Sequence, residues 1–87
     1  MPTYLIETPH TMEECAWSLK QILDHGTQML DKFNWGCMDD EHRGWAIVEA
    51  ANKFEAQDII PTILRSKARI IELQKFTADE VRAFHAR

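Results

Sequence analysis

Four segments of the chain have the apolar pattern of β-strands: short runs rich in aromatic and β-branched residues, two of which alternate with polar positions at a period of two. The first, Tyr4–Thr8, carries aromatic and β-branched residues and stops at Pro9, which cannot donate to a strand ladder. The other three predicted strands are Lys32–Met38, Gly44–Ala50 and Arg69–Phe76. The turn-like residues between the second and third strands predict an antiparallel hairpin.

Apolar positions at helical spacing lie between these strands. One helix is predicted over Thr11–Leu30, with a bend or an early end at Gly26. A second is predicted over Lys53–Ser66, with a break at Pro61, which removes a backbone hydrogen bond. A third, short helix begins at Thr77 and runs to the end of the chain. Each start has a Thr or Asn followed three positions later by Glu, the spacing of a capping box.

The order of elements is therefore β-α-β-β-α-β with a short C-terminal helix, which predicts an α+β domain of ferredoxin-like topology. The length of 87 residues fits a single domain over residues 1–87. A composition of 45% hydrophobic and 28% charged residues is that of a folded chain.

Strand alternation also assigns the two faces of the sheet. Ile6, Val48, Ile71 and Leu73 are predicted to pack under the helices. The residues expected on the opposite face are Leu5, Glu7, Trp45, Ile47, Glu49, Ile70, Glu72 and Gln74. An exposed face with this many large apolar groups is unfavourable for a monomer. We therefore expect a homodimer whose sheets pack face to face around an enclosed space, the arrangement of a dimeric α+β barrel.

Several stretches of the chain resemble small bacterial and archaeal proteins of unknown function. The similarity covers nearly the whole chain and is carried by Ile6–His10, Trp35–Met38, Asp40–Ala50, Leu64–Ala68 and Lys75–Thr77. Those proteins are similar to the dimeric α+β barrel superfamily, which includes monooxygenases, isomerases, stress-responsive proteins and a nickel-responsive protein. The resemblance implies the fold and the dimer, but members of that superfamily do not share one chemistry.

Three carboxylates occupy mid-strand positions, where they are poorly favoured: Glu7, Glu49 and Glu72. On an enclosed face, burial and mutual repulsion would raise at least one of their pKa values, as general acid or base chemistry requires. They are therefore our candidates for lining a ligand pocket. The remaining candidates for this pocket are Trp45, Trp35 and Gln74. Ion pairing of the carboxylates with Arg43, Arg69 or Lys75 stays open as the alternative.

A second candidate site is a metal site. His10 follows the first strand and His42 precedes the third, so both are expected near one edge of the sheet. Imidazoles together with Glu7 or Glu49 suit a divalent transition metal, and Cys37 would add a soft ligand. No H-x-x-x-H or C-x-x-C spacing is present. Surface histidines are the alternative, and His25 and His85 are expected to be exposed helix residues.

Charge and terminal composition bear on partners and location. A net charge of −4 argues against nucleic-acid binding, which needs clustered Lys and Arg. The chain carries neither a signal-peptide pattern nor an apolar run long enough to span a membrane, so we expect a cytoplasmic protein with reduced thiols and no membrane partner.

Three functions are compatible with these observations. The first is a homodimer that binds a small molecule or a metal ion in the acidic pocket. The second is a cofactor-independent enzyme, similar to an isomerase or a monooxygenase, in which a pocket Glu or His moves a proton. The third is a structural or interaction module.

Overall fold

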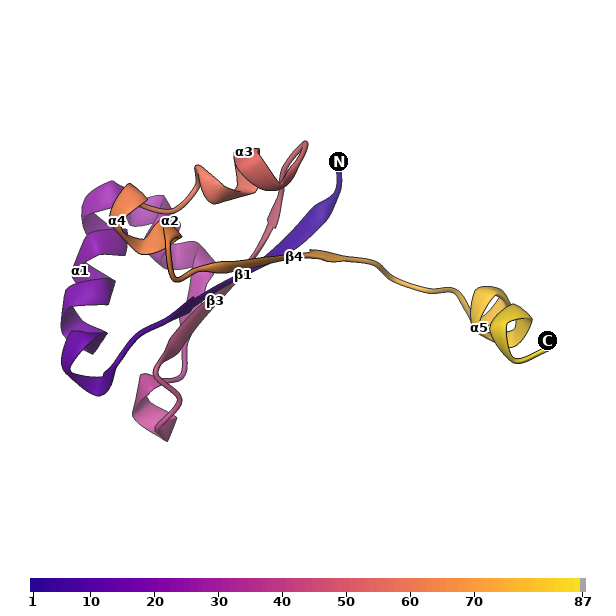
Figure 1. Ribbon diagram of the computed structural model, residues 1–87, viewed down its shortest axis with the longest axis horizontal. Helices are drawn as coiled ribbons and strands as arrows, with labels where there is room; N and C mark the ends of the chain where they lie inside the picture. Colours follow the sequence, from indigo (N-terminus) through magenta and orange to yellow (C-terminus); the bar gives the residue numbers. More distant parts are fainter. Residues whose placement is uncertain (87) are drawn as a thin grey trace.

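The computed structural model describes residues 1–86 and is an α+β domain with one four-stranded sheet (Figure 1). The strands are β1 Thr3–Pro9, β2 Phe33–Trp35, β3 Arg43–Glu49 and β4 Arg69–Leu73. The helices are α1 Cys15–His25, α2 Thr27–Lys32, α3 Lys53–Gln57, α4 Thr62–Arg65 and α5 Ala78–His85, with 3₁₀ turns η1 Met12–Glu14 and η2 Cys37–Asp39. The sheet is antiparallel in the order β2-β3-β1-β4. This confirms the predicted α+β class and element order, and it is compatible with a small ferredoxin-like fold.

Both predicted interruptions of the long helices are confirmed. Gly26 separates α1 from α2 with φ 155°, a left-handed backbone value that L side chains rarely adopt. Pro61 separates α3 from α4, as predicted, because proline has no backbone N–H with which to continue the helix. The predicted caps are present too: Glu55 N donates to the Asn52 side chain, and Glu80 N donates to the Thr77 hydroxyl.

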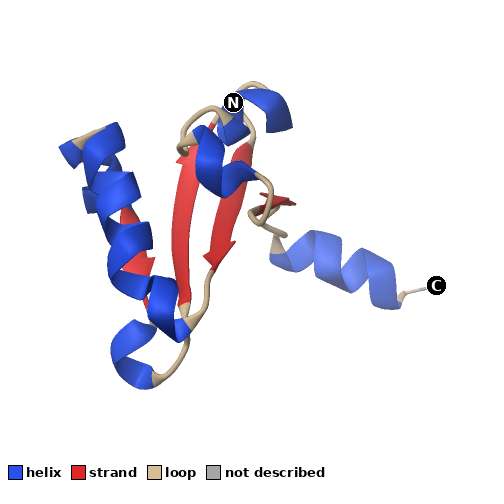
Figure 2. Cartoon of the chain, turned by 60° about the vertical axis from the view of Figure 1, so that its left-hand side comes forward, coloured by secondary structure: helices blue, strands red, loops and turns tan. Residues whose placement is uncertain are grey.

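The hydrophobic core lies between the helices and one face of the sheet, and Figure 2 shows helices covering that face. Tyr4 and Ile6 of β1 and Ala46 and Val48 of β3 are buried there. Ile22 of α1 is completely buried against them. The other side of the sheet is not covered by helices, and we call it the open face. It carries the residues of β1–β4 that lie between the buried ones along each strand.

The register of β4 shows that our face assignment for this strand was wrong by one position. Ile70 lies opposite Ile6, and Glu72 lies opposite Tyr4, so both belong to the helix-covered face. Ile71 and Leu73 lie on the open face instead, because they pair with Leu5 and Thr3. Strand 69–73 contains two adjacent isoleucines and a leucine, so its pattern is apolar on both faces and does not fix its phase.

Two strands are shorter than predicted, for identifiable reasons. The predicted strand 32–38 ends at Trp35 because Gly36 starts a tight turn and accepts from both Asp39 N and Glu41 N. The predicted strand 69–76 ends at Leu73, which pairs with Thr3, the first residue of β1. Beyond that point the neighbouring strand offers no residue to pair with.

After β4 the chain leaves the body of the molecule and ends in α5, which projects away from the sheet (Figure 1). The molecule is therefore elongated, 49 × 29 × 22 Å, with a radius of gyration of 15.5 Å. A compact domain of this length would have a radius of gyration of about 12 Å. We call residues 74–86 the C-terminal arm.

Candidate metal centre

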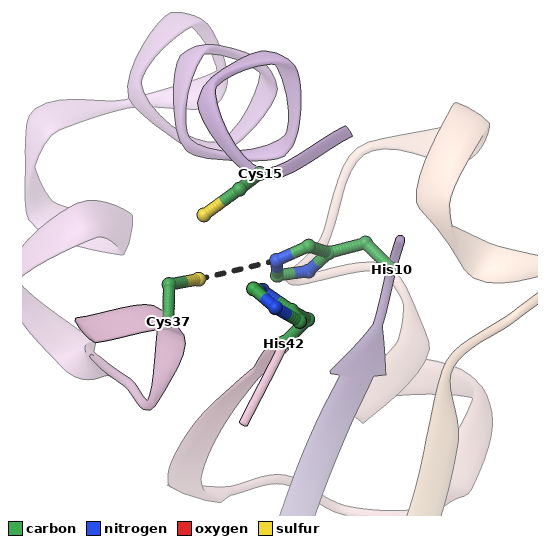
Figure 3. A group of neighbouring side chains, drawn as sticks. All are labelled: His10, Cys15, Cys37 and His42. Carbon is green, nitrogen blue, oxygen red and sulfur yellow. Dashed lines mark hydrogen bonds between the residues drawn. The ribbon is translucent and has the colours of Figure 1, made fainter. Parts of the chain in front are cut away.

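Four side chains with metal-binding atoms converge at one end of the sheet: His10, Cys15, Cys37 and His42. One donor atom from each lies within 4.8 Å of the donor atoms of the other three. Figure 3 shows the four side chains turned toward a common centre, although they come from four separate segments. All four are partly buried.

The two histidines are held together by the sheet. The backbone N–H of His10 donates to the carbonyl of His42 at 3.0 Å, which continues the pairing of β1 with β3 past Pro9 and Arg43. Neighbouring residues on adjacent antiparallel strands point to the same side. Their rings accordingly lie 6.1 Å apart in an edge-on arrangement.

The two cysteines come from the segments that flank this strand pair. Cys15 is the first residue of α1, directly after the η1 turn. Cys37 is the first residue of η2, in the loop that connects β2 to β3. Gly36 fixes that loop because a Cβ at position 36 would lie 2.8 Å from the Glu41 Cβ and carbonyl oxygen. Cys37 Sγ lies 3.2 Å from His10 Nε2.

Several polar atoms at this cluster are buried but unpaired. Nδ1 of His10 and Nδ1 of His42 lack a hydrogen-bond partner among residues 1–86. Buried polar atoms in native proteins are nearly always paired, so an unpaired set needs an explanation. A bound ion takes one nitrogen of each ring. Nε2 is the His10 nitrogen that faces Cys37, so coordination through Nε2 would leave Nδ1 of His10 without a partner.

The Cys37 thiol is held in its protonated form at neutral pH. Burial, and then the neighbouring Cys15, raise the pKa of Cys37 to about 11. Both cysteines are free of disulfides in the described part of the chain. A metal ion that bound here would therefore have to displace thiol protons, as it does in other thiolate sites.

Two thiols and two imidazoles form the Cys₂His₂ donor set of structural zinc sites, which is four-coordinate and tetrahedral. Zn–S bonds of about 2.3 Å and Zn–N bonds of about 2.0–2.1 Å place tetrahedral donors roughly 3.3–3.8 Å apart. The donors here, within 4.8 Å of one another, need side-chain shifts of only about 1 Å to reach that geometry. Soft sulfur and imidazole donors favour zinc over calcium or magnesium, which take oxygen ligands.

The neighbouring cavities do not open onto the centre of the cluster. A cavity of about 60 Å³ lies against His10, between Ser18 of α1 and Leu64 of α4, and an open depression of about 380 Å³ is bounded by His10 and Lys67. None of the other three donor residues lines either space. A site with four protein ligands and no open position has the form of a structural centre, since catalytic zinc sites keep one position for water or substrate.

Three members of this cluster are candidates already in the sequence, and the fourth is not. His10, His42 and Cys37 lie together as predicted, but Cys15, rather than Glu7 or Glu49, completes the set. In the sequence, Cys15 is one position of the predicted helix Thr11–Leu30. The signal that could have identified it is its place at the first turn of that helix, five residues after His10.

The three candidate glutamates do not form a pocket in the single chain. Glu7 is nearly buried on the open face, where it accepts a hydrogen bond from Trp45 Nε1 at 3.1 Å. Its carboxylate also lies 3.6 Å from Arg43 and 3.7 Å from Arg69, the ion pairing left open above. Glu49 is exposed on the same face at the opposite end of β3.

The other pocket candidates are dispersed. Glu72 is exposed on the helix-covered side, next to Tyr4. Trp35 also faces the helices and packs on His10, with ring centroids 5.9 Å apart, so it supports the metal centre instead. Gln74 lies past β4 and lines a groove with Ile47 and Leu73. His25 and His85 are exposed helix residues, as predicted.

Comparison of the chain with models of known families, with curated proteins and with solved structures finds no match. Within residues 1–86, none of the helices has the length and apolar character needed to cross a membrane.

Proposed function

We propose that this protein binds one divalent transition-metal ion of the zinc class per chain, at His10, Cys15, Cys37 and His42. The observation that carries the proposal is the convergence of four soft or borderline donor atoms within 4.8 Å. His10 and His42 lie directly beyond the paired ends of β1 and β3, and the two cysteines start α1 and η2, so the ion would tie these segments together. Its role is then structural, to fix the end of the sheet.

Cobalt is a suitable probe because tetrahedral Co²⁺ with thiolate ligands absorbs strongly in the visible and near-ultraviolet range, whereas Zn²⁺ is silent. Reduced, metal-free protein titrated with Co²⁺ is expected to develop these bands to an end point of one ion per chain. Zn²⁺ should then displace the Co²⁺ and bleach the bands. Equilibrium dialysis with elemental analysis gives the zinc stoichiometry independently.

Substitution of the ligands tests the assignment residue by residue. Cys15→Ser, Cys37→Ser, His10→Gln and His42→Gln should each weaken zinc binding by more than about 100-fold, because loss of an outer-shell partner alone costs about 10–100-fold. His25→Gln and His85→Gln are the matched controls, since both histidines are exposed and lie outside the cluster. Zinc binding that survives Cys15→Ser and Cys37→Ser, or that is lost equally in the controls, would refute the proposal.

A further inference from the structure

The C-terminal arm carries apolar side chains that the rest of its own chain leaves exposed. Val81 and Phe84 lie on one side of α5, at the i, i+3 spacing of a helix face. Phe84 is 59% exposed, Phe76 is 55% exposed, and their rings lie 5.6 Å apart, edge to face. The arm is thus a small apolar unit of its own, with a capped helix.

The open face of the sheet carries the second uncovered apolar surface. Ile47 of β3 is 65% exposed at its centre. By register, its neighbours on this face are Leu5, Trp45, Ile71 and Leu73, all half-buried. At the foot of the arm, Thr3, Ile47 and Leu73 line a groove of about 470 Å³ together with Gln74 and Lys75.

We propose that a second copy of this chain covers the open face, and that each copy lays its C-terminal arm across the sheet of the other. Two observations select this occupant. The arm and the open face are both apolar, both exposed and both on the same chain, so one two-fold axis buries both at once in a self-complementary interface. The elongated shape, with α5 held away from its own body, is that of one half of an exchanged pair (Figure 1).

The charged residues fit this arrangement. The one carboxylate nearly buried on the open face, Glu7, already has partners in Trp45, Arg43 and Arg69. Covering Glu7 therefore does not leave this carboxylate as an unpaired buried charge, which would otherwise oppose association. Ile47 and the groove beside it remain as the apolar anchor for Phe84 of the partner copy.

Sedimentation velocity of the full chain over a range of concentrations tests the dimer. We expect twice the chain mass for the unmodified protein, and a shift to the monomer for both Ile47→Glu on the face and Phe84→Glu on the arm. Phe54→Glu is the matched control, because Phe54 is 79% exposed but lies on α3, away from the open face. Circular dichroism identifies any variant that fails to fold, and Leu73→Glu then replaces Ile47→Glu.

The exchange of arms is tested with a photoreactive benzoyl-phenylalanine at position 84 in a mixture of isotopically light and heavy chains. We expect cross-links to peptides of β3 or β4, half of them joining a light chain to a heavy one. Cross-links only within one chain would mean that the arm folds back on its own sheet, and would overturn the exchange. A monomeric native protein, or a dimer insensitive to Phe84→Glu, would overturn the proposal as well.

Discussion

Burial and a neighbouring charge act together on the ionisation of the Tyr4 hydroxyl group. Tyr4 is buried in the core, and Glu72 lies opposite it on β4. Burial, and then the nearby Glu72 carboxylate, raise the pKa of Tyr4 above its ordinary value of 10.0. Tyr4 is the only tyrosine of the chain, so its titration can be followed without overlap.

We predict that Glu72→Gln lowers the pKa of Tyr4, because it removes the negative charge that disfavours the phenolate. Burial remains, so the pKa should stay above 10.0. The measurement is the ultraviolet absorbance of tyrosinate as a function of pH. Glu49→Gln, on the opposite face of the sheet, is the control and should leave the titration unchanged.

The same pKa shift predicts how the stability of the fold changes with pH. A phenol whose pKa is higher in the folded than in the unfolded chain stabilises the fold fully below the unfolded value, and this contribution is lost as pH rises through the folded value. Unfolding by urea should thus show stability falling above about pH 10, and falling less steeply in Glu72→Gln. An equal slope in both proteins would contradict the assignment.

A second prediction at this scale concerns close packing beside the metal centre. A Cβ at Gly44 would lie 2.8 Å from the Trp35 ring and 2.9 Å from the Thr8 hydroxyl. Gly44→Ala should therefore destabilise the fold by about 1–3 kcal/mol, the cost of overpacking a full site. In the background Trp35→Leu the added cost should shrink, and a double-mutant cycle by urea unfolding measures the difference. An unchanged cost would show that the ring is not the obstacle.

Individual residues also show how far the sequence determined the site. His10 and His42 were placed at one edge of the sheet because strand order brings them there. Cys15 was missed since its spacing to Cys37 matches no local motif, and only the folded loop after Gly36 brings the two thiols together. The carboxylates were favoured instead because a mid-strand Glu is unusual, but Glu7 is explained by its arginine and tryptophan partners.

At the scale of elements, the proposed metal ion would join segments that strand pairing alone holds together only in part. Cys15 starts α1 and Cys37 starts η2, and few backbone bonds tie either turn to the strands. An ion shared by these turns and the ends of β1 and β3 would suppress their local opening. The effect should be confined to this end of the domain.

We predict that zinc slows amide hydrogen exchange in residues 10–15 and 36–43 and leaves α5 unchanged. Free zinc at 100 times the dissociation constant should also add about 2.7 kcal/mol to the free energy of unfolding. Hydrogen-exchange mass spectrometry and thermal unfolding measure the two effects. Cys15→Ser should abolish both, and protection spread evenly over the chain would argue against a local centre.

The residue patterns of the individual elements predict most of the fold. The bounds of β1 and β3 lie within one residue of the predicted strands, because their aromatic and β-branched residues agree with the adjacent caps and breakers. The phase of β4 failed since Ile70 and Ile71 are equivalent to a pattern of period two, and only pairing with Leu5 and Ile6 decides between them. The end of β2 is set by the tight turn at Gly36. The end of β4 depends on where β1 begins, which no local pattern of residues 69–76 contains.

At the scale of the whole molecule, the metal centre and the foot of the C-terminal arm lie at opposite ends of the sheet. The arm leaves β4 at Leu73, beside Thr3 at the start of β1, whereas His10 follows the last residue of β1. Seven strand residues at about 3.3 Å each separate the two ends by roughly 23 Å. The metal centre also lies on the helix side of the strands that present the open face, next to Trp35.

We therefore predict that zinc binding and dimerisation are energetically independent. The dimer dissociation constant should change by no more than about twofold between zinc-loaded and chelator-treated protein, since distant sites depart from additivity by only about 0.3–0.5 kcal/mol. Reciprocally, Ile47→Glu should leave zinc affinity intact, and Cys15→Ser should leave the dimer intact. Sedimentation and Co²⁺ titration measure both directions. A tenfold effect in either direction must appear in the other by thermodynamic linkage, and it would mean that the strands β1 and β3 transmit the ion's position to the open face.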